Sequence, residues 1–168
     1  MTLPVPDSAW FRNSGGIHGV SHTLRVLRHA ERLSSALGLP GLEREAALVA
    51  ALWHDVGRTH DGWDRRHGAK SAAKVARLGL GRGLDPELSR LAHFAVELHC
   101  LPDRAAPRAA ARHPDPDLAL RVLWVLKDAD GLDRVRLEPW DGLDSKRLRF
   151  ECSKEMVGEA RRLLREGP

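Results

Sequence analysis

The feature that most constrains the fold of this chain is the spacing of its apolar residues. Between residues 22 and 37, Leu24, Leu27 and Leu33 recur at intervals that place them on one face of a helix. Similar spacing continues along most of the chain. The alternation of polar and apolar residues that is typical of strands is scarce, and the hairpin dipeptide Asn-Gly does not occur. The sequence therefore predicts an all-α protein.

Glycines and prolines divide this pattern into about six helices. Ser21 is the expected N-cap of the first helix, and Gly38 follows its end. The second helix is expected to stop at Gly57, and Pro86 lies in the first turn of the fourth. The stretch 101–116 contains four prolines and is expected to form a loop with at most a short helical turn. The expected helices cover about residues 22–37, 42–56, 67–80, 86–99, 117–132 and 145–165.

The length of 168 residues fits one domain with a full hydrophobic core, so we expect residues 1–168 to form a single unit. The apolar runs fall well short of the ~20 residues that a membrane span needs. The first residues lack the basic and apolar regions of a secretory signal. We therefore expect a cytoplasmic protein that does not act in a membrane.

The charge pattern of the chain favours small anionic ligands without excluding larger ones. The net charge is +4 and the isoelectric point about 9.6, but acidic residues lie between the basic ones throughout. This distribution does not indicate nucleic acid as a partner, whereas a mild positive charge helps to attract a phosphorylated substrate. Cys100 and Cys152 lack C-x-x-C spacing, and two cysteines are too few for a disulfide framework. We interpret both as free thiols.

Histidine and aspartate residues near predicted helix ends are the candidate site. The adjacent pair His54-Asp55 follows the apolar run Ala50–Trp53. Burying an imidazole and a carboxylate there without partners is costly, but both suit a divalent metal. An isolated pair of this kind is weak evidence, because helices often end on such residues at the surface. Four further candidates also fall near helix ends: His22, His67, His99 and Asp130.

Four short motifs occur in one order along residues 19–136. They are H-x-x-R-V from His22, L-x-H-D-x-G-R from Leu52, H-G-x-x-S-A from His67 and A-D-x-L-D from Ala129. Their order and local contexts resemble the HD superfamily of metal-dependent phosphohydrolases. The resemblance implies an α-helical bundle with one or two divalent metals at its centre, and the helix at 145–165 would cover that bundle.

The resemblance also implies the roles of individual residues. The primary metal ligands would be His22, His54, Asp55 and Asp130. The extra histidines of binuclear members correspond to His67 and His99, in which case Asp55 bridges both metals. The metal could be Mn, Fe, Mg, Co, Ni or Zn.

Two features leave alternatives open in this ligand set. Asp128 lies two residues before Asp130 and is the alternative ligand. Some family members carry two adjacent histidines at the position of His99, whereas the second place is Cys100 here. The sequence alone therefore leaves the number of metals undecided.

Basic residues beside these motifs are candidates to bind phosphate. A divalent cation lowers the pKa of bound water towards ~7 and neutralises phosphate oxygens, so His54 and Asp55 would act in catalysis. We expect Lys127 and Arg58 to support the reaction by binding phosphate, which arginine can do in a bidentate manner. The remaining candidates, which we assign to substrate binding, are Arg25, Lys70 and His18.

Three functions fit these residues. The first is hydrolysis of a nucleotide or a related small phosphoester. The second is a di-iron oxygenase of the HD type, and the third is a metal-stabilised nucleotide-binding domain without turnover. Trp63 lies in the loop after the His-Asp pair, where we interpret it as an anchor of the loop, with stacking on a base as the alternative. The sequence does not specify the natural substrate, the oligomeric state or the pathway.

Overall fold

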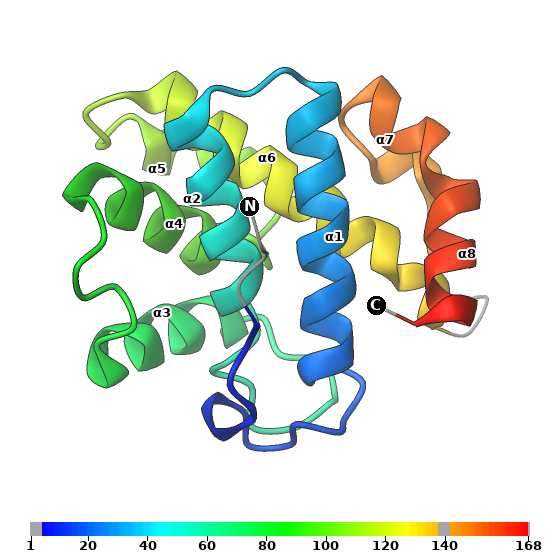
Figure 1. Cartoon of the computed structure of the whole chain (residues 1–168). Helices are drawn as coiled ribbons and strands as arrows, with labels where there is room; N and C mark the ends of the chain where they lie inside the picture. The colour runs from blue at the N-terminus through cyan, green and yellow to red at the C-terminus, as the bar shows by residue number, and fades with distance from the viewer. Residues whose placement is uncertain (1–4, 138–141, 168) are drawn as a thin grey trace.

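A computed structural model describes residues 5–137 and 142–167. These residues form helices and connecting loops, and none of them lies in a strand, which confirms the all-α class. The described residues form eight α-helices, where about six were expected. Figure 1 shows their arrangement. Their bounds are α1 Val20–Ala36, α2 Gly41–Trp53, α3 His67–Leu78, α4 Pro86–Leu98, α5 Ala106–Ala110, α6 Pro116–Asp133, α7 Glu151–Glu155 and α8 Val157–Glu166.

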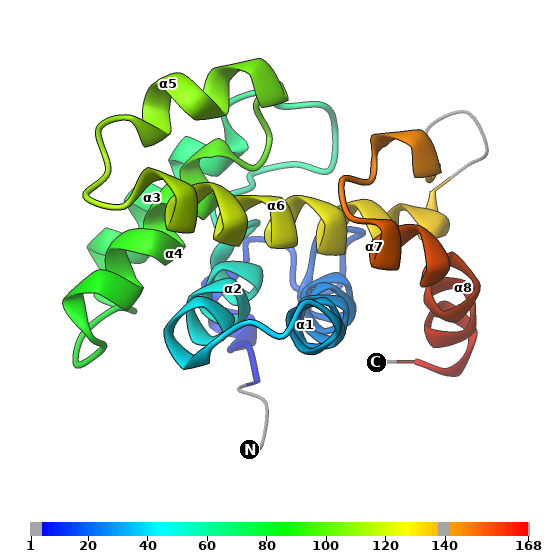
Figure 2. The ribbon, with the colours of Figure 1, turned by 90° about the horizontal axis from the view of Figure 1, so that it is seen from above.

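Helix α6 packs against helices from both the N-terminal and the C-terminal parts of the chain. The helices α1 and α2 lie side by side, and α6 crosses both of them (Figures 1 and 2). Helix α4 packs against α2, α3 and α6. Helices α7 and α8 pack against α1 and α6. A buried apolar cluster joins these helices.

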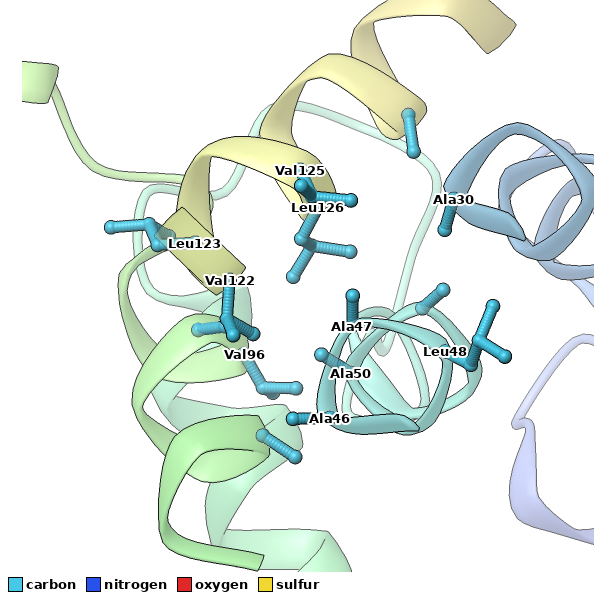
Figure 3. Packing of buried hydrophobic residues seen from close by; sticks show 14 of the residues in the cluster. Ala30, Ala46, Ala47, Leu48, Ala50, Val96, Val122, Leu123, Val125 and Leu126 are labelled. Carbon is cyan, nitrogen blue, oxygen red and sulfur yellow. The ribbon is translucent and has the colours of Figure 1, made fainter. Parts of the chain in front are cut away.

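Small side chains in α2 allow its neighbours to approach closely. Ala46, Ala47, Ala50 and Ala51 are fully buried in this helix. Larger residues of α6, including Leu126, fill the space around them (Figure 3). Because alanine projects little beyond the helix backbone, α2 becomes the centre of the bundle, and the residues at its C-terminal end are buried with it.

Two glycines allow α3 to approach the end of α2 and the end of α4. A Cβ atom at Gly57 would overlap the backbone of Lys70 and Ser71, and the Gly57 N–H donates to Ser71 Oγ at 2.9 Å. A Cβ atom at Gly68 would lie 2.6 Å from the carbonyl oxygens of Val96 and Glu97. These approaches leave no room for a larger residue, and they bring the first turn of α3 to the His-Asp pair.

The first helix begins earlier than predicted. Gly19 is its N-cap, and Ser21 lies inside the first turn, so the prediction that Ser21 caps this helix was wrong. The Gly19 carbonyl accepts from the Thr23 N–H at 3.0 Å, which starts the helix without a side-chain cap. The second helix ends at Trp53, so His54 and Asp55 lie in the turn that follows it.

The predicted helix over residues 145–165 is divided into three parts. A 3-10 turn at Ser145–Arg147 is followed by α7 and α8, which meet at Met156. The reason lies in α6, where the buried carboxylate of Asp128 accepts from the backbone N–H groups of Arg149 and Phe150. The segment 101–116 likewise contains more helix than expected, since α5 follows a 3-10 turn at Asp103–Ala105.

Within the described residues, no helix has the length and apolar character that crossing a lipid bilayer requires.

Candidate metal centre

All six predicted ligands meet at one place, where five chain segments approach each other. His22 comes from the first turn of α1, and His54 and Asp55 from the turn after α2. The remaining three are His67 at the start of α3, His99 directly after α4, and Asp130 in the last turn of α6. Their nitrogen and oxygen atoms lie in two adjoining donor groups, one around His22 and His54 and one around His67 and His99, and His18 approaches Asp55 from the side.

The first donor group lies between α1, α2 and α6. The Nε2 atoms of His22 and His54 are 3.0 Å apart. The Nε2 atom of His22 also lies 3.4 Å from Asp130 Oδ1 and 3.5 Å from Asp55 Oδ2. These four side chains are the primary ligands that the sequence predicts.

The second donor group lies between α3 and α4. The Nε2 atoms of His67 and His99 are 2.8 Å apart. The Oδ1 atom of Asp55 is 3.4 Å from the first of these nitrogens and 3.8 Å from the second. The two carboxylate oxygens of Asp55 therefore face different groups, so this residue could contribute to both.

The far ring nitrogens of three histidines fix their tautomers. His54 Nδ1 lies 2.7 Å from the Ala51 carbonyl oxygen. In the same way, the Nδ1 atoms of His67 and His99 lie 2.5 Å and 2.7 Å from carbonyl oxygens. A carbonyl oxygen only accepts, so each Nδ1 must carry the proton. In the neutral rings, each Nε2 then presents a lone pair to the centre.

The first histidine is oriented differently, by a carboxylate. His22 Nδ1 lies 2.7 Å from Asp133 Oδ2, so this nitrogen also donates. With His22 neutral, the lone pairs of His22 and His54 face each other across 3.0 Å, which is unfavourable unless a cation lies between them. Imidazole nitrogens and carboxylate oxygens are donors that divalent transition metals accept. The residues present therefore fit a divalent metal.

The protonation states of the ligands suit a metal at neutral pH. Burial lowers the pKa of His54 to about 3 and that of His67 to about 4, so both rings are neutral. Burial by itself raises the pKa of Asp55, but the surrounding imidazoles, His54 first among them, hold it well below its usual range. The pKa of Asp130 is also lowered, since His22 and His54 outweigh its loss of hydration.

The pKa of His22 shifts in the opposite direction from those of His54 and His67. Burial lowers its pKa, but the hydrogen bonds to Asp133 and Asp55 outweigh this effect and raise it overall. Without a metal, the proton on His22 can thus occupy part of the space between the imidazoles and carboxylates. A metal that binds there must displace that proton.

Comparison with known proteins agrees with this geometry. The sequence profile of the HD domain family matches residues 19–135. The chain belongs to the HD family. HD domains form a superfamily of metal-dependent phosphohydrolases, and the matched range includes the His54-Asp55 pair. No curated protein and no solved structure matches the chain.

The structure places Asp128, the alternative ligand of the HD site, elsewhere. Its carboxylate accepts from Ser153 Oγ at 2.7 Å and from Arg149 Nη1 at 2.8 Å. Together with the two backbone N–H groups at the start of α7, these donors use both carboxylate oxygens. Asp130, which is about one-third exposed towards the cleft, is the α6 aspartate in the first donor group.

Asp133 is a residue of the site that the sequence analysis missed. It is fully buried and orients His22 through Nδ1. Arg25 in turn binds this carboxylate with two hydrogen bonds, from Nε at 2.6 Å and from Nη2 at 3.1 Å, and Arg136 lies 3.3 Å away. The available signal was the spacing, because Asp133 follows Asp130 by three residues and so lies near it on the helix surface.

Two of the predicted substrate-binding residues have other partners. Arg25 is committed to Asp133 and does not line the cleft beside the metal centre. Lys70 pairs with Asp64 at 2.6 Å, with its side chain 43% exposed, and it also lies outside the cleft lining. Both residues belong to a motif that contains a predicted ligand. Their side chains form ion pairs with Asp133 and Asp64 instead of facing the cleft.

The other predicted residues lie at the cleft. His18 Nδ1 is 2.8 Å from Asp55 Oδ2. Arg58 Nε donates to Asp55 Oδ1 at 3.1 Å, and Lys127 Nζ donates to the Leu101 carbonyl oxygen at 2.6 Å. All three line the same cleft as Asp55.

This cleft has a volume of about 910 Å³ and contains Asp55, His67, His99 and Asp130 among its lining residues. The loop 58–66 and the segment 142–149 border it, and both lie on the same side of α6 (Figure 2). Its described lining includes five aspartates and eight basic residues: Arg58, Arg65, Lys127, Arg134, Arg136, Lys146, Arg147 and Arg149. Since metal ions would neutralise Asp55 and Asp130, the basic residues would outnumber the remaining aspartates of the loaded cleft.

Proposed function

We propose that this HD protein is a divalent-metal-dependent phosphohydrolase that acts on a nucleotide or a related small phosphoester. The observation that carries the proposal is the position of the two donor groups. Asp55 faces both of them, with Oδ2 3.5 Å from His22 Nε2 and Oδ1 3.4 Å from His67 Nε2. Asp55 and Asp130 line a cleft whose described residues are rich in arginine and lysine. Hydrolysis of a phosphoester needs both the metal ligands and the basic cleft. The phosphate is anionic before the reaction, and negative charge develops on the leaving oxygen during it.

The residues of the chain would divide the work as follows. His22, His54, Asp55 and Asp130 would hold one metal, and His67 and His99 with Asp55 would hold a second. A bound divalent cation supplies charge to phosphoryl oxygens and an acidified water at neutral pH. The buried position of His54 and Asp55 keeps these ligands rigid and excludes bulk water from their far side.

Basic side chains of the cleft would bind the substrate phosphate. Arg58 is held against Asp55 and against the Gly62 carbonyl oxygen, so its guanidinium is fixed beside the bridging carboxylate. Lys127 donates to Leu101 and Asp103, which leaves one of its three protons for a phosphate oxygen. The electrostatic attraction of these groups would gather and orient an anionic substrate.

The same ligand set suits a di-iron oxygenase, which is the second candidate function. The feature in its favour is the pair of adjoining donor groups with the Asp55 carboxylate between them. The basic cleft favours hydrolysis over this alternative, because oxygen activation does not require eight cationic side chains at the entrance. A metal-stabilised nucleotide-binding domain remains the third candidate and differs from the first only in turnover.

Metal analysis combined with a substrate screen tests the proposal. The purified protein is analysed for bound metals and then assayed with Mn, Fe, Mg, Co, Ni and Zn on bis-p-nitrophenyl phosphate, p-nitrophenyl phosphate and nucleotides. We expect turnover that is equal with and without oxygen and that is lost in His54→Ala and Asp55→Ala. His113→Ala, which removes a histidine outside the cleft lining, is the matched control and should retain activity.

Two results would contradict hydrolysis. Turnover that requires oxygen, together with a mixed-valent iron signal, would establish the oxygenase. Tight nucleotide binding without turnover under every metal would establish the binding domain.

A further inference from the structure

The loop after the His-Asp pair presents one aromatic side chain to solvent. Trp63 is 83% exposed and borders the cleft that contains the two donor groups. Its described ring contact is with the guanidinium of Arg65, which lies 5.5 Å from the ring centre. A tryptophan that anchored the loop would be buried against the core, so the anchoring role expected from the sequence is wrong.

The backbone on both sides of this indole is fixed. On one side, the Gly62 carbonyl accepts from Arg58 Nη1 at 3.1 Å, and the same guanidinium binds Asp55. On the other side, the Asp64 carbonyl accepts from His67 Nδ1 at 2.5 Å. The loop is thus tied to Asp55 through Arg58 directly before Trp63, and to His67 itself directly after it.

A third set of contacts, made by the Asp64 side chain, also holds the loop. The Asp64 carboxylate pairs with Lys70 Nζ at 2.6 Å and accepts from the Arg66 N–H at 2.8 Å. These bonds fix the backbone without using the indole. The fold therefore holds Trp63 in place but does not need its side chain for packing.

We propose that Trp63 is the stacking surface for the base of a nucleotide whose phosphate lies at the metal centre. This inference rests on the proposed function. Aromatic side chains bind bases through their faces, and this contact tolerates any base because each presents a π-face. The neighbouring Arg65 guanidinium adds a cation at the same edge of the cleft. The protein should therefore distinguish a nucleotide from its sugar phosphate and discriminate weakly among bases.

The position of Trp63 favours a base over a protein partner. Its surroundings in the cleft are polar and charged, with Asp64 and Arg65 beside it, whereas a docking surface for a protein is usually a contiguous apolar patch. The other exposed large hydrophobic residues, such as Leu78 and Ile17, do not line the cleft.

The experiment compares a nucleotide with its abasic counterpart. Wild type, Trp63→Ala and Trp63→Phe are assayed with AMP and ribose 5-phosphate under the best metal. We expect Trp63→Ala to raise KM for AMP by roughly 5- to 100-fold, with kcat nearly unchanged, because stacking contributes equally to the ground and transition states. KM for ribose 5-phosphate should not change, and Trp63→Phe should restore most of the affinity for AMP.

A binding measurement makes the result independent of turnover. Calorimetry on the metal-loaded proteins uses phosphonate analogues of AMP and ribose 5-phosphate, in which a methylene group replaces the ester oxygen. Trp63→Ala should weaken binding of the AMP analogue alone, by the same roughly 5- to 100-fold. Leu78→Ala, at an exposed apolar residue outside the cleft, is the control and should leave both affinities unchanged.

The outcomes separate this inference from the proposed function. If the base-dependent loss of binding occurs but no phosphoester is hydrolysed, stacking stands and the hydrolase proposal fails. If the AMP analogue does not bind, if Trp63→Ala leaves its affinity unchanged, or if both analogues weaken equally, stacking is overturned even where hydrolysis occurs. A concentration-dependent dimer that Trp63→Ala abolishes without changing nucleotide affinity would assign the indole to self-association instead.

Discussion

The four imidazoles of the metal centre are oriented in two different ways. His54, His67 and His99 each donate Nδ1–H to a carbonyl oxygen of the backbone three residues earlier. His22 donates to the carboxylate of Asp133, which two arginines hold. A carboxylate partner makes a ligating imidazole more basic and fixes its orientation, so His22 should depend on a side chain where the other three depend on local backbone.

Replacing Asp133 by asparagine should therefore weaken metal binding. The loss of this outer partner typically reduces metal affinity by about 10- to 100-fold. Competition with a chelating dye measures the dissociation constant. Asp128→Asn is the matched control, because this second buried aspartate of α6 binds the start of α7 instead of a ligand. Asp128→Asn should reduce stability and leave the metal affinity unchanged. Equal affinities in wild type and Asp133→Asn would refute the orienting role.

His29 is a buried histidine that the site does not use. Neither ring nitrogen has a hydrogen-bond partner among the described residues. Burial lowers its pKa to about 4 from 6.5, against the opposing influence of Asp133. The unfolded chain therefore takes up a proton near pH 6.5 that the folded chain does not take up until about pH 4. This difference lowers stability as the pH falls through that window.

The substitution His29→Leu should remove this effect. At pH 7.5 the variant should be as stable as wild type or more stable, because it no longer buries unpaired nitrogens. Between pH 7.5 and pH 4.5 its advantage should grow by about 2–3 kcal/mol. Urea unfolding at several pH values measures this difference. A constant difference across the range would show that His29 titrates alike in the folded and unfolded chains.

At the scale of elements, the position of α3 decides whether the second donor group forms. His67 reaches Asp55 and His99 because α3 lies against the turn after α2 and against the end of α4. Gly57 and Gly68 permit both approaches, as a side chain at either position would meet backbone atoms. The glycine of the L-x-H-D-x-G-R motif thus serves the packing of α3, which in turn delivers a ligand.

The substitution Gly57→Ala should displace α3 from the metal centre. We expect a loss of stability of about 1–3 kcal/mol from overpacking, together with weaker binding of the second metal. Urea unfolding and metal titration report the two effects. Gly41→Ala is the matched control, because an added Cβ there meets no atom within 4 Å, and it should be neutral or slightly stabilising. If Gly57→Ala behaved like Gly41→Ala, the close approach would not constrain α3.

At the scale of the whole molecule, the metal centre is where distant parts of the chain are joined. His22 and Asp133 are 111 residues apart in sequence, and His54 and His22 are 32 apart. The donors come from α1, α3, α6 and the turns that follow α2 and α4. The unfolded chain cannot assemble them, so a metal would bind the folded state alone and would stabilise it.

Metal should accordingly raise the stability of the whole protein. At a free metal concentration 100 times the dissociation constant, one site contributes about 2.7 kcal/mol. Thermal unfolding with Mn²⁺ and then with EDTA should show a reversible rise and fall in Tm. The gain should shrink in His54→Ala and Asp55→Ala and persist in His113→Ala. A Tm that does not respond to any divalent metal would contradict the assignment of the centre.

Local pattern in the sequence was enough to predict the helical class and most of the helix positions, and the resemblance of its motifs to the HD superfamily implied the six residues that now surround the centre. Helical periodicity and punctuation depend on neighbouring residues, and the motifs around His22, His54, His67 and Asp130 are also local. The tertiary structure decided which aspartate of α6 faces the site, the partnership of Asp133 with His22, the division of the last predicted helix and the exposure of Trp63. Each of these depends on contacts between residues far apart in the chain, and such contacts exist only once the helices have packed.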